Sequence, residues 1–335
     1  SDAVTSIRNL SPSRNLARAY GWLGGIAVLG AFVLLTFYAV IAGWVSAYVV
    51  SAASGNLSGL SVETSGRLFS DLVSQADTMI AHQILFLVFL GMILVRKLSS
   101  GIERANLVLM PALIAMLIGI AIYGAAIGDL SAALAFLFTP DFSKITPEVV
   151  QSAIGHGFFS VGVGAAMLIT YGAYLDKSVD LGKTAILIAL ADTAIALLAG
   201  IGIFSIVFGQ SLDAASGPGL IFTTLPLAFS QLPGGGFIAL VFFVLVYFAA
   251  LTSGLSLAEV IIRWAENKFS WGRKRATLAM LGLTFIVGLA TVFSFNICQD
   301  VRLTSTGVLA DKTLFDVKDY LVTGYIMRLG GLGAI

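Results

Sequence analysis

Long apolar stretches constrain this chain more than any other feature of its sequence. A helix needs about 20 mostly apolar residues to cross a bilayer. Only 11% of the residues are charged, whereas soluble domains carry roughly a quarter, so lipid must be the solvent for much of the surface. We therefore expect an all-α polytopic membrane protein with eight spans. These are Tyr20–Val50, His82–Val95, Leu107–Ile127, Val149–Tyr174, Leu181–Phe208, Gly236–Ile262, Ala276–Phe295 and an incomplete span from about Leu314.

The basic residues indicate how these spans are oriented. If the spans alternate in direction, thirteen Lys and Arg residues fall on the side of the N-terminal end and five on the other side. Cytoplasmic loops of membrane proteins carry the excess of Lys and Arg. The pattern predicts a single transmembrane domain over residues 1–335, in the cell (inner) membrane, with a cytoplasmic N-terminal end.

Both ends of the sequence are expected to be truncated. The chain starts with the polar residues Ser1-Asp2-Ala3, without an initiator Met or a signal peptide, and it stops inside an apolar run at Ile335. We expect an internal piece of a longer protein.

Cysteine, histidine and charge content exclude several classes of function. The single cysteine, Cys298, allows no intrachain disulfide, and two histidines, His82 and His156, are too few for a His-rich metal site. The net charge of +1, without a basic run, gives no nucleic-acid patch. Motifs of the HExxH, GxSxG and phosphate-loop types are absent from the sequence, and no catalytic residue is predicted.

The region from Gly155 to Ala166 contains four glycines within ten positions. Each glycine weakens a helix by about 1 kcal/mol relative to alanine. Transporters use breaks of this kind, because freed carbonyls and helix termini bind ions and substrates near the middle of the membrane. Close helix packing through small residues explains the glycines equally well. Both interpretations stay open at this point.

Polar side chains also occur at three further points within the predicted spans, where contact with lipid would be unfavourable. Asp192 lies in the middle of an apolar span, so its carboxylate should face a cavity, a cation or neighbouring hydroxyls. Thr252 and Ser253 lie one turn from the Ala249 carbonyl, which suits either local side-chain bonding or a site for a hard cation. Tyr38 lies deep in its span, where its hydroxyl needs a partner.

One pair of charges is expected to be structural. Glu259 and Arg263 are one helical turn apart near the end of a span. This spacing predicts a surface ion pair without a role in function.

Taken in order, these stretches resemble the neurotransmitter:sodium symporter family, particularly its bacterial amino-acid transporters. Gly157-Phe158-Phe159-Ser160 to Tyr174 is similar to the broken sixth helix of the family, and Asp192 to Gly200 resembles the seventh. Phe248 to Ser253 resembles the eighth, Phe37-Tyr38 to Gly43-Trp44 the third, and Ser294 to Leu303 the approach to the tenth. Gly101 and Pro111 reproduce a Gly-x9-Pro spacing of the fifth helix that is linked to cytoplasmic opening.

The resemblance implies an inverted-repeat sodium-symporter fold with a broken helix, extending from the third helix to the start of the tenth. It implies two Na⁺ sites in the complete protein, and the missing first helix would supply much of both. A chain of this extent is not expected to transport alone.

The resemblance also implies a role for each matching residue. Tyr38 would bind the carboxylate of the substrate, and Phe159 would close over it. Asp319 would be the acidic partner in the extracellular gate, with His156 close to that gate. The pocket for the substrate side chain would be lined by Leu34, Gly162, Ala165, Leu168, Ser253 and Leu257. The first sodium site would use Ser160 and Asp192, and the second Ala249, Thr252 and Ser253.

Three positions depart from the family pattern. Ala165, aided by Gly162, leaves room where a bulky residue often stands, so we expect a large or aromatic hydrophobic substrate. His156 replaces a common glutamine, which leaves a pH-sensitive gate or a neutral hydrogen-bonding histidine open. Ala196 stands where chloride-independent members can carry an acid, and Asp192 would compensate for its absence.

The sequence therefore predicts sodium-coupled symport of an amino acid by alternating access, with sodium ions, an amino acid and the bilayer as partners. One alternative is a transporter of the same fold with another substrate or with proton coupling. Another is a non-transporting membrane receptor, and a membrane enzyme is third. The sequence does not identify the amino acid, the sodium stoichiometry or the oligomeric state.

Overall fold

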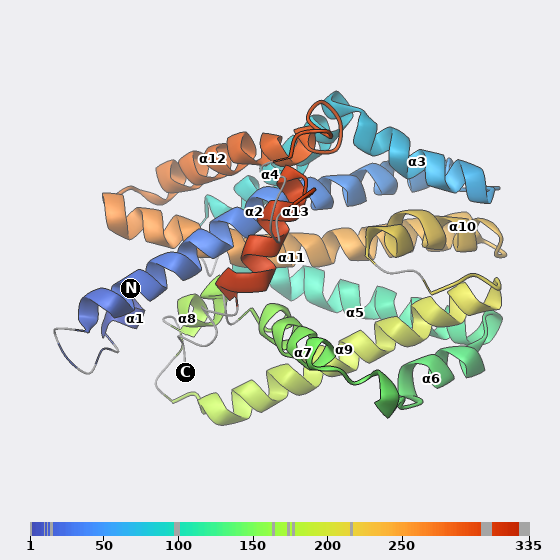
Figure 1. The fold of residues 1–335 in the computed structure, drawn as a ribbon, viewed down its shortest axis with the longest axis horizontal. Helices are drawn as coiled ribbons and strands as arrows, with labels where there is room; N and C mark the ends of the chain where they lie inside the picture. The colour runs from blue at the N-terminus through green and yellow to red at the C-terminus, as the bar shows by residue number, and fades with distance from the viewer. Residues whose placement is uncertain are drawn as a thin grey trace.

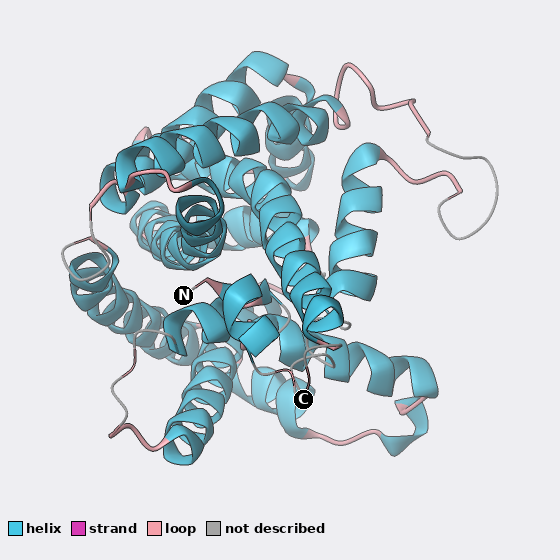
Figure 2. Ribbon diagram, turned by 90° about the vertical axis from the view of Figure 1, so that its left-hand side faces the viewer, coloured by secondary structure: helices cyan, strands magenta, loops and turns pink. Residues whose placement is uncertain are grey.

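The computed structural model describes residues 2–9, 11, 13, 16–96, 101–162, 165–172, 175, 178–214, 217–302 and 310–327. Within these ranges the chain folds into helices joined by turns and loops, without a strand (Figure 2). This confirms the predicted all-α class. Six helices are long and apolar enough to span a membrane: α2 (Ala17–Ala53), α4 (Ala76–Leu94), α5 (Ile102–Ile127), α9 (Leu181–Gly209), α11 (Gly235–Phe269) and α12 (Arg273–Phe293).

Shorter elements complete the described chain, and two of the predicted spans fall among them. The fourth predicted span consists of two short helices, α7 and α8, and the last is described only as far as Met327. The short elements are α1 (Ala3–Asn9), α3 (Val62–Ser74), α6 (Leu130–Phe138), η1 (Phe142–Lys144), α7 (Pro147–Ser160), α8 (Met167–Gly172), η3 (Leu220–Thr224), α10 (Leu225–Ser230), α13 (Leu314–Leu321) and η4 (Val322–Ile326).

Helix α4 is longer than the sequence predicted. It begins at Ala76 rather than at His82, and so reaches 19 residues. The additional turn carries Asp77 and Thr78, which are polar but compatible with a helix that emerges from the membrane. An acidic residue in the first turn is also favourable for the helix dipole.

The two longest helices, α2 and α11, pack against each other at the centre of the bundle (Figure 1). Helices α4 and α12 cover one side of this pair, and α5 lies on the other side between α11 and α9. Leu35 of α2, Phe86 of α4 and Leu255 of α11 are completely buried where these helices meet. Burial of such apolar side chains between the helices fixes their mutual position.

Helices α5 and α9 approach each other through glycines. A Cβ atom at Gly124 would lie 2.5 Å from the carbonyl oxygen of Gly202, and one at Gly202 would lie 3.0 Å from the Cα of Ala121. Only residues without a side chain fit such a contact, which is typical of helix pairs in membranes. The contact fixes the position of α9, which carries Asp192.

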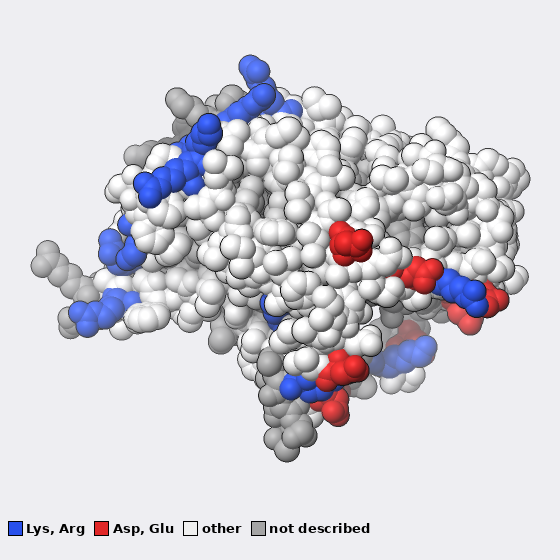
Figure 3. Space-filling view, turned by 90° about the horizontal axis from the view of Figure 1, so that it is seen from above, with Lys and Arg blue, Asp and Glu red and all other residues white. Residues whose placement is uncertain are grey.

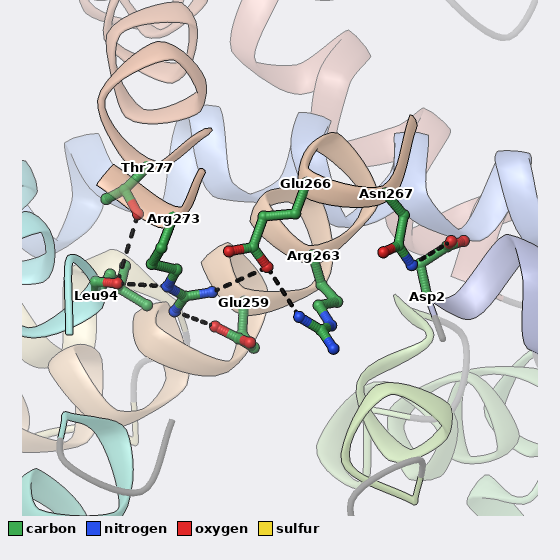
Figure 4. A network of polar contacts seen from close by, with 8 residues as sticks. All are labelled: Asp2, Leu94, Glu259, Arg263, Glu266, Asn267, Arg273 and Thr277. Carbon is green, nitrogen blue, oxygen red and sulfur yellow. Dashed lines mark hydrogen bonds and ion pairs between the residues drawn. The ribbon is translucent and has the colours of Figure 1, made fainter. Parts of the chain in front are cut away.

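A network of ion pairs and hydrogen bonds joins α11, α12 and α4 at one end of the bundle (Figure 4). Glu259 is only 1% exposed and forms an ion pair with Arg273, whose Nη1 also lies 3.8 Å from Glu266. Arg263 pairs with Glu266 at 3.1 Å. The prediction that Glu259 lies at the surface is therefore wrong, because α12 and its Arg273 side chain cover this face of α11.

Two further hydrogen bonds stabilise this end of the bundle. Arg273 donates from Nε to the Leu94 carbonyl at the end of α4, at 2.7 Å. Asn267 donates to the Asp2 carboxylate at 2.8 Å. Burial would raise the pKa of the Asp2 carboxyl, but hydrogen bonds from Asn267 and Thr5 outweigh burial, and this pKa lies below its ordinary value.

Charged residues divide the molecule into two ends (Figure 3). Lys and Arg gather at one end, which includes the end of α4 and the starts of α9 and α12, and we call it the basic end. Asp and Glu side chains, with a few Lys or Arg beside them, lie toward the opposite end of the same view, beyond a broad uncharged surface. An uncharged belt between two charged ends suits a protein that crosses a bilayer.

Candidate functional site

The helix is interrupted between α7 and α8. The last helical residue of α7 is Ser160, and the next residue, Val161, caps the helix end. Gly162 has a φ of +70° and Ala166 a φ of +56°, both in the left-handed region. Glycine adopts that region readily, whereas alanine does so at a cost. The glycine-rich stretch is therefore a broken helix rather than a continuous helix with a small-residue face, as the resemblance implied.

Ser160 and Asp192, the residues predicted for a first sodium site, lie together at this break. The hydroxyl of Ser160 donates toward both carboxylate oxygens of Asp192, with distances of 2.7 Å to Oδ1 and 2.8 Å to Oδ2. Ser160 ends α7, and Asp192 lies near the middle of α9. The carboxylate is half-buried, and the hydroxyl orients it at the level where the helix breaks.

This pair forms a small cluster of hard oxygen ligands with one negative charge. Such oxygens suit alkali and alkaline-earth cations, whereas transition metals prefer imidazole and thiolate ligands. No group of three or more His, Cys, Asp or Glu residues gathers within the described ranges to hold a metal ion. The chemistry of the pair fits Na⁺.

The predicted second sodium site lies in α11. Thr252 donates from its hydroxyl to the Ala249 carbonyl at 3.0 Å. This bond is the local interaction that the sequence left open as the alternative to a cation site. It keeps a hydroxyl and a carbonyl oxygen next to each other, and Ser253 follows directly with an exposed side chain.

The structure brings most of the predicted substrate residues together. The Tyr38 hydroxyl of α2 interacts with the Ser253 hydroxyl of α11 through a side-chain hydrogen bond. Leu34, Ala165 and Leu257 are at most 3% exposed and belong to one continuous apolar cluster, against which Tyr38 packs. The cluster joins α2, the helix break and α11. A polar pair thus borders an apolar lining, as a site for an amphiphilic molecule requires.

Leu168 lies apart from this cluster. It stands in the first turn of α8 and is 40% exposed. The described residues therefore do not enclose its side chain together with Leu34 and Leu257.

Met167 occupies the space that the sequence assigned to Gly162. A Cβ atom at Gly162 would lie 2.3 Å from the terminal methyl of Met167, whose side chain packs against the same apolar cluster. The sequence analysis did not single out Met167, because it considered only the small side chains of Gly162 and Ala165 as a source of space for the substrate. The only available signal was a flexible side chain beside a helix break.

A cavity of about 770 Å³ opens between α7 and the segment from α13 to η4. His156 and Phe159 both line it, and Phe159 is 41% exposed. The opposite wall includes Tyr320 and Tyr325, whose hydroxyls lie 3.0 Å apart. Two of the three predicted gate residues thus face one space, and two tyrosines that the sequence did not single out face them.

Asp319, the third predicted gate residue, directly precedes the cavity-lining Tyr320 on α13. It is half-buried, and its backbone carbonyl accepts a hydrogen bond from the Thr323 hydroxyl at 2.7 Å. Within the part of the chain that the structure describes, no basic side chain forms an ion pair with Asp319 within 4 Å.

Gly101 and Pro111, the predicted hinge residues, lie just before α5 and within it. Gly101 is buried and caps the start of the helix, and Pro111 lies inside it. Proline cannot donate to the carbonyl four residues earlier, here that of Leu107, so the helix is weakened at this level.

The matches to known proteins agree with this arrangement. A model of the Sodium:neurotransmitter symporter family matches residues 62–299. The chain belongs to this family. An uncharacterized sodium-dependent transporter of Bacillus subtilis, YhdH, is 35% identical over 312 residues, which make up 93% of this chain and 67% of that protein. Another from Haemophilus influenzae is 33% identical over 329 residues, 97% of this chain and 71% of that protein.

A solved structure of this symporter family has the same fold. The crystal structure of MhsT in complex with L-phenylalanine matches with a TM-score of 0.88 at 35% identity, over 99% of this chain and 74% of MhsT. The symporter fold expected from the resemblance is thereby confirmed. The protein is a sodium-dependent transporter for a small molecule and a multi-pass protein of the inner membrane, and it is not an enzyme.

Proposed function

We propose that this symporter uses the sodium gradient to import a large or aromatic hydrophobic amino acid by alternating access. The observation that carries the proposal is the Ser160–Asp192 pair at the break between α7 and α8. A carboxylate and a hydroxyl beside unwound backbone can hold a cation and a substrate carboxylate next to each other. Bound sodium then favours the conformation that binds substrate, which is the origin of coupling.

The proposal includes two sodium sites. Ser160 and Asp192 contribute to the first, where the negative charge of the carboxylate compensates the ion. Ala249, Thr252 and Ser253 contribute to the second, where the ion replaces the hydrogen of the Thr252 hydroxyl as the partner of the Ala249 carbonyl. The adjacent oxygens of Thr252 and Ala249 support this second site.

The substrate would lie with its carboxylate toward Tyr38 and its side chain toward the apolar cluster. The interaction of Tyr38 with Ser253 supports a polar role for this hydroxyl, which would exchange Ser253 for the substrate carboxylate. Leu34, Gly162, Ala165 and Leu257 would surround the side chain, Met167 would have to move for a bulky one, and Leu168 would join them only if α8 moves toward the cluster. That MhsT binds L-phenylalanine supports an aromatic substrate in a similar fold.

Gates and a hinge complete the proposed cycle. Phe159 would close over the substrate, with His156 and Asp319 on the outer side of the same passage. Gly101 and Pro111 would allow α5 to bend when the cytoplasmic side opens. The shared cavity of His156 and Phe159, and the weakened position at Pro111, support these roles.

We also propose eight spans, with the basic end and the N-terminal end in the cytoplasm. The concentration of Lys and Arg at one end of the bundle supports this orientation (Figure 3). Transport is proposed to be independent of chloride, because Asp192 supplies a negative charge near Ala196, one turn further along α9.

The test is uptake of labelled tryptophan and leucine by the complete protein in proteoliposomes, with and without an inward sodium gradient. Sodium-driven accumulation that is unchanged without chloride supports the proposal. Accumulation driven by a proton gradient alone would instead assign the coupling to Asp192 as a proton site. Substrate binding without uptake would indicate a receptor.

A further inference from the structure

An apolar groove runs between α4 and α12 on the outer face of the bundle. It encloses about 620 Å³ and is lined by residues of these two helices only. Its rims are exposed: Val88 is 50%, Met92 53% and Leu278 60% accessible. Exposed side chains of this kind fit a bilayer, and the groove adds a hollow for one extended chain.

Two glycines, Gly91 and Gly282, line the groove without being needed for helix packing. A Cβ atom at Gly282 would meet no atom within 4 Å, and one at Gly91 would only touch Leu281 Cδ1 at 3.4 Å. The contact between Gly124 and Gly202 is different, because there an added Cβ atom would clash with backbone. Packing between α4 and α12 therefore does not require glycine at positions 91 and 282, and the missing side chains leave the groove open there.

Unneutralised positive charge lies at one end of the groove. Leu278 also lines a second hollow, of about 830 Å³, at the start of α12 together with Lys274 and Arg275. Neither Lys274 nor Arg275 forms an ion pair with a carboxylate of the described residues. The Arg275 guanidinium instead lies over the Trp271 ring, 4.8 Å from its centre. The N-terminal dipole of α12 adds to this positive potential.

The nearby carboxylates of Glu259 and Glu266 do not neutralise this charge, because both pair with Arg273. Arg273 and Thr277 both bond to the Leu94 carbonyl, so the end of α4 is held against the start of α12. Arg96 follows Leu94 by two residues and brings a further positive charge to this end. The groove thus leads from an apolar belt directly into a basic cluster, at the basic end of the molecule (Figure 3).

We propose that the groove between α4 and α12 is a binding site for an anionic phospholipid of the cytoplasmic leaflet. One acyl chain lies along Gly91 and Gly282, and the phosphate lies at Lys274 and Arg275. Basic pockets at the cytoplasmic ends of spanning helices suit anionic head groups, and this leaflet is negatively charged. A neutral lipid would leave the two charges unpaired. A second copy in the same orientation would bring its own basic end toward this one, which repels.

The test is lipid retention measured by native mass spectrometry on the purified complete protein, mixed with equal amounts of phosphatidylglycerol and phosphatidylcholine. The wild type should retain the anionic lipid about thirty-fold over the neutral one, as expected for two basic side chains that each contribute about 1 kcal/mol near a lipid surface. Lys274→Gln with Arg275→Gln should abolish this preference. Lys183→Gln with Lys268→Gln removes the same number of charges elsewhere at the basic end and should retain it.

A second pair of variants tests the acyl chain. Gly282→Leu fills the groove without a clash and should reduce retention of both lipids, whereas Gly119→Leu fills open space on α5 and should not. Sodium-driven uptake by each variant checks its folding. Equal lipid preference in the two double variants, or equal retention in the two leucine variants, overturns the proposal. A change of oligomeric mass in Gly282→Leu without loss of lipid assigns the groove to a second copy and overturns it as well.

Discussion

The Ser160 hydroxyl lies within hydrogen-bond distance of both carboxylate oxygens of Asp192, at 2.7 and 2.8 Å. The two residues are 32 positions apart in sequence, on α7 and α9. The bond joins the end of an interrupted helix to the middle of a continuous one. Any movement of α7 relative to α9 must therefore change the surroundings of this carboxylate.

Replacement of Asp192 by Asn should remove the charge while keeping the shape of the side chain. A hydrogen bond or ligand bond to a charged group contributes about 1.5–3 kcal/mol, so we expect sodium-driven uptake to fall about ten-fold or more, with a higher sodium requirement. Asp213→Asn, on an exposed loop, is the matched control. Uptake by Asp192→Asn with an unchanged sodium dependence would contradict the proposed first site.

Thr252 distinguishes a sodium ligand from a local helix bond. Thr252→Val keeps the volume and removes the hydroxyl, whereas Thr252→Ser keeps the hydroxyl. If the oxygen binds sodium, the valine variant should need about five-fold more sodium for half-maximal uptake, as expected for the loss of about 1 kcal/mol, and the serine variant should behave like the wild type. If the hydroxyl only bonds to Ala249, both variants will show the sodium dependence of the wild type.

Substrate size should depend on two positions near the helix break. Ala165→Phe places a ring in the apolar cluster, so small amino acids should gain over tryptophan by about ten-fold in uptake competition, within the range known for hydrophobic pockets. Met167→Ala should shift the preference in the opposite direction, because it empties the space beside Gly162. Competition profiles identical to the wild type in both variants would exclude these residues from the substrate pocket.

The sequence could predict the long apolar helices, but not the packing around them. Apolar length is a local signal, and α2 and α9 follow from it, whereas the glycines from 155 to 164 left a break and close packing open, and only the family resemblance implied the interruption after Ser160. The meeting of Ser160 with Asp192 depends on tertiary structure, so only the family resemblance could suggest it. The short helix α3 was missed, because its amphipathic residues carry no span signal and its capping box at Ser61 is a local feature outside the apolar runs.

Glu259 shows the limit of spacing arguments most clearly. An i, i+4 pair on one helix predicts a surface bridge, yet the α12 arginine Arg273 competes for the same carboxylate and buries it. The spacing of charged residues along α11 does not predict which neighbouring helix covers this face. The partner comes from the next helix, and only the turn between α11 and α12 brings the two together.

The buried pair of Glu259 and Arg273 should therefore be important for stability. Arg273→Met deprives a carboxylate that is 1% exposed of this partner, and removal of one member of a buried ion pair costs about 3–5 kcal/mol. We expect a clear drop in the thermal unfolding temperature of the detergent-solubilised protein. Adding Glu259→Gln to Arg273→Met should recover part of the loss. A double variant less stable than either single one would show that the pair is not the source of the effect.

Pro111 should control the rate at which the cytoplasmic side opens. Pro111→Ala restores an amide that can donate to the Leu107 carbonyl, and so it stiffens α5 at the proposed hinge. We expect the maximal uptake rate to fall several-fold while sodium-dependent substrate binding stays unchanged, because the variant alters opening and not the site. Ala115→Gly, one turn further along α5, is the control that loosens the helix elsewhere. If Pro111→Ala transports at the wild-type rate, α5 does not bend at this proline during the cycle, and the hinge must lie at Gly101 or outside this helix.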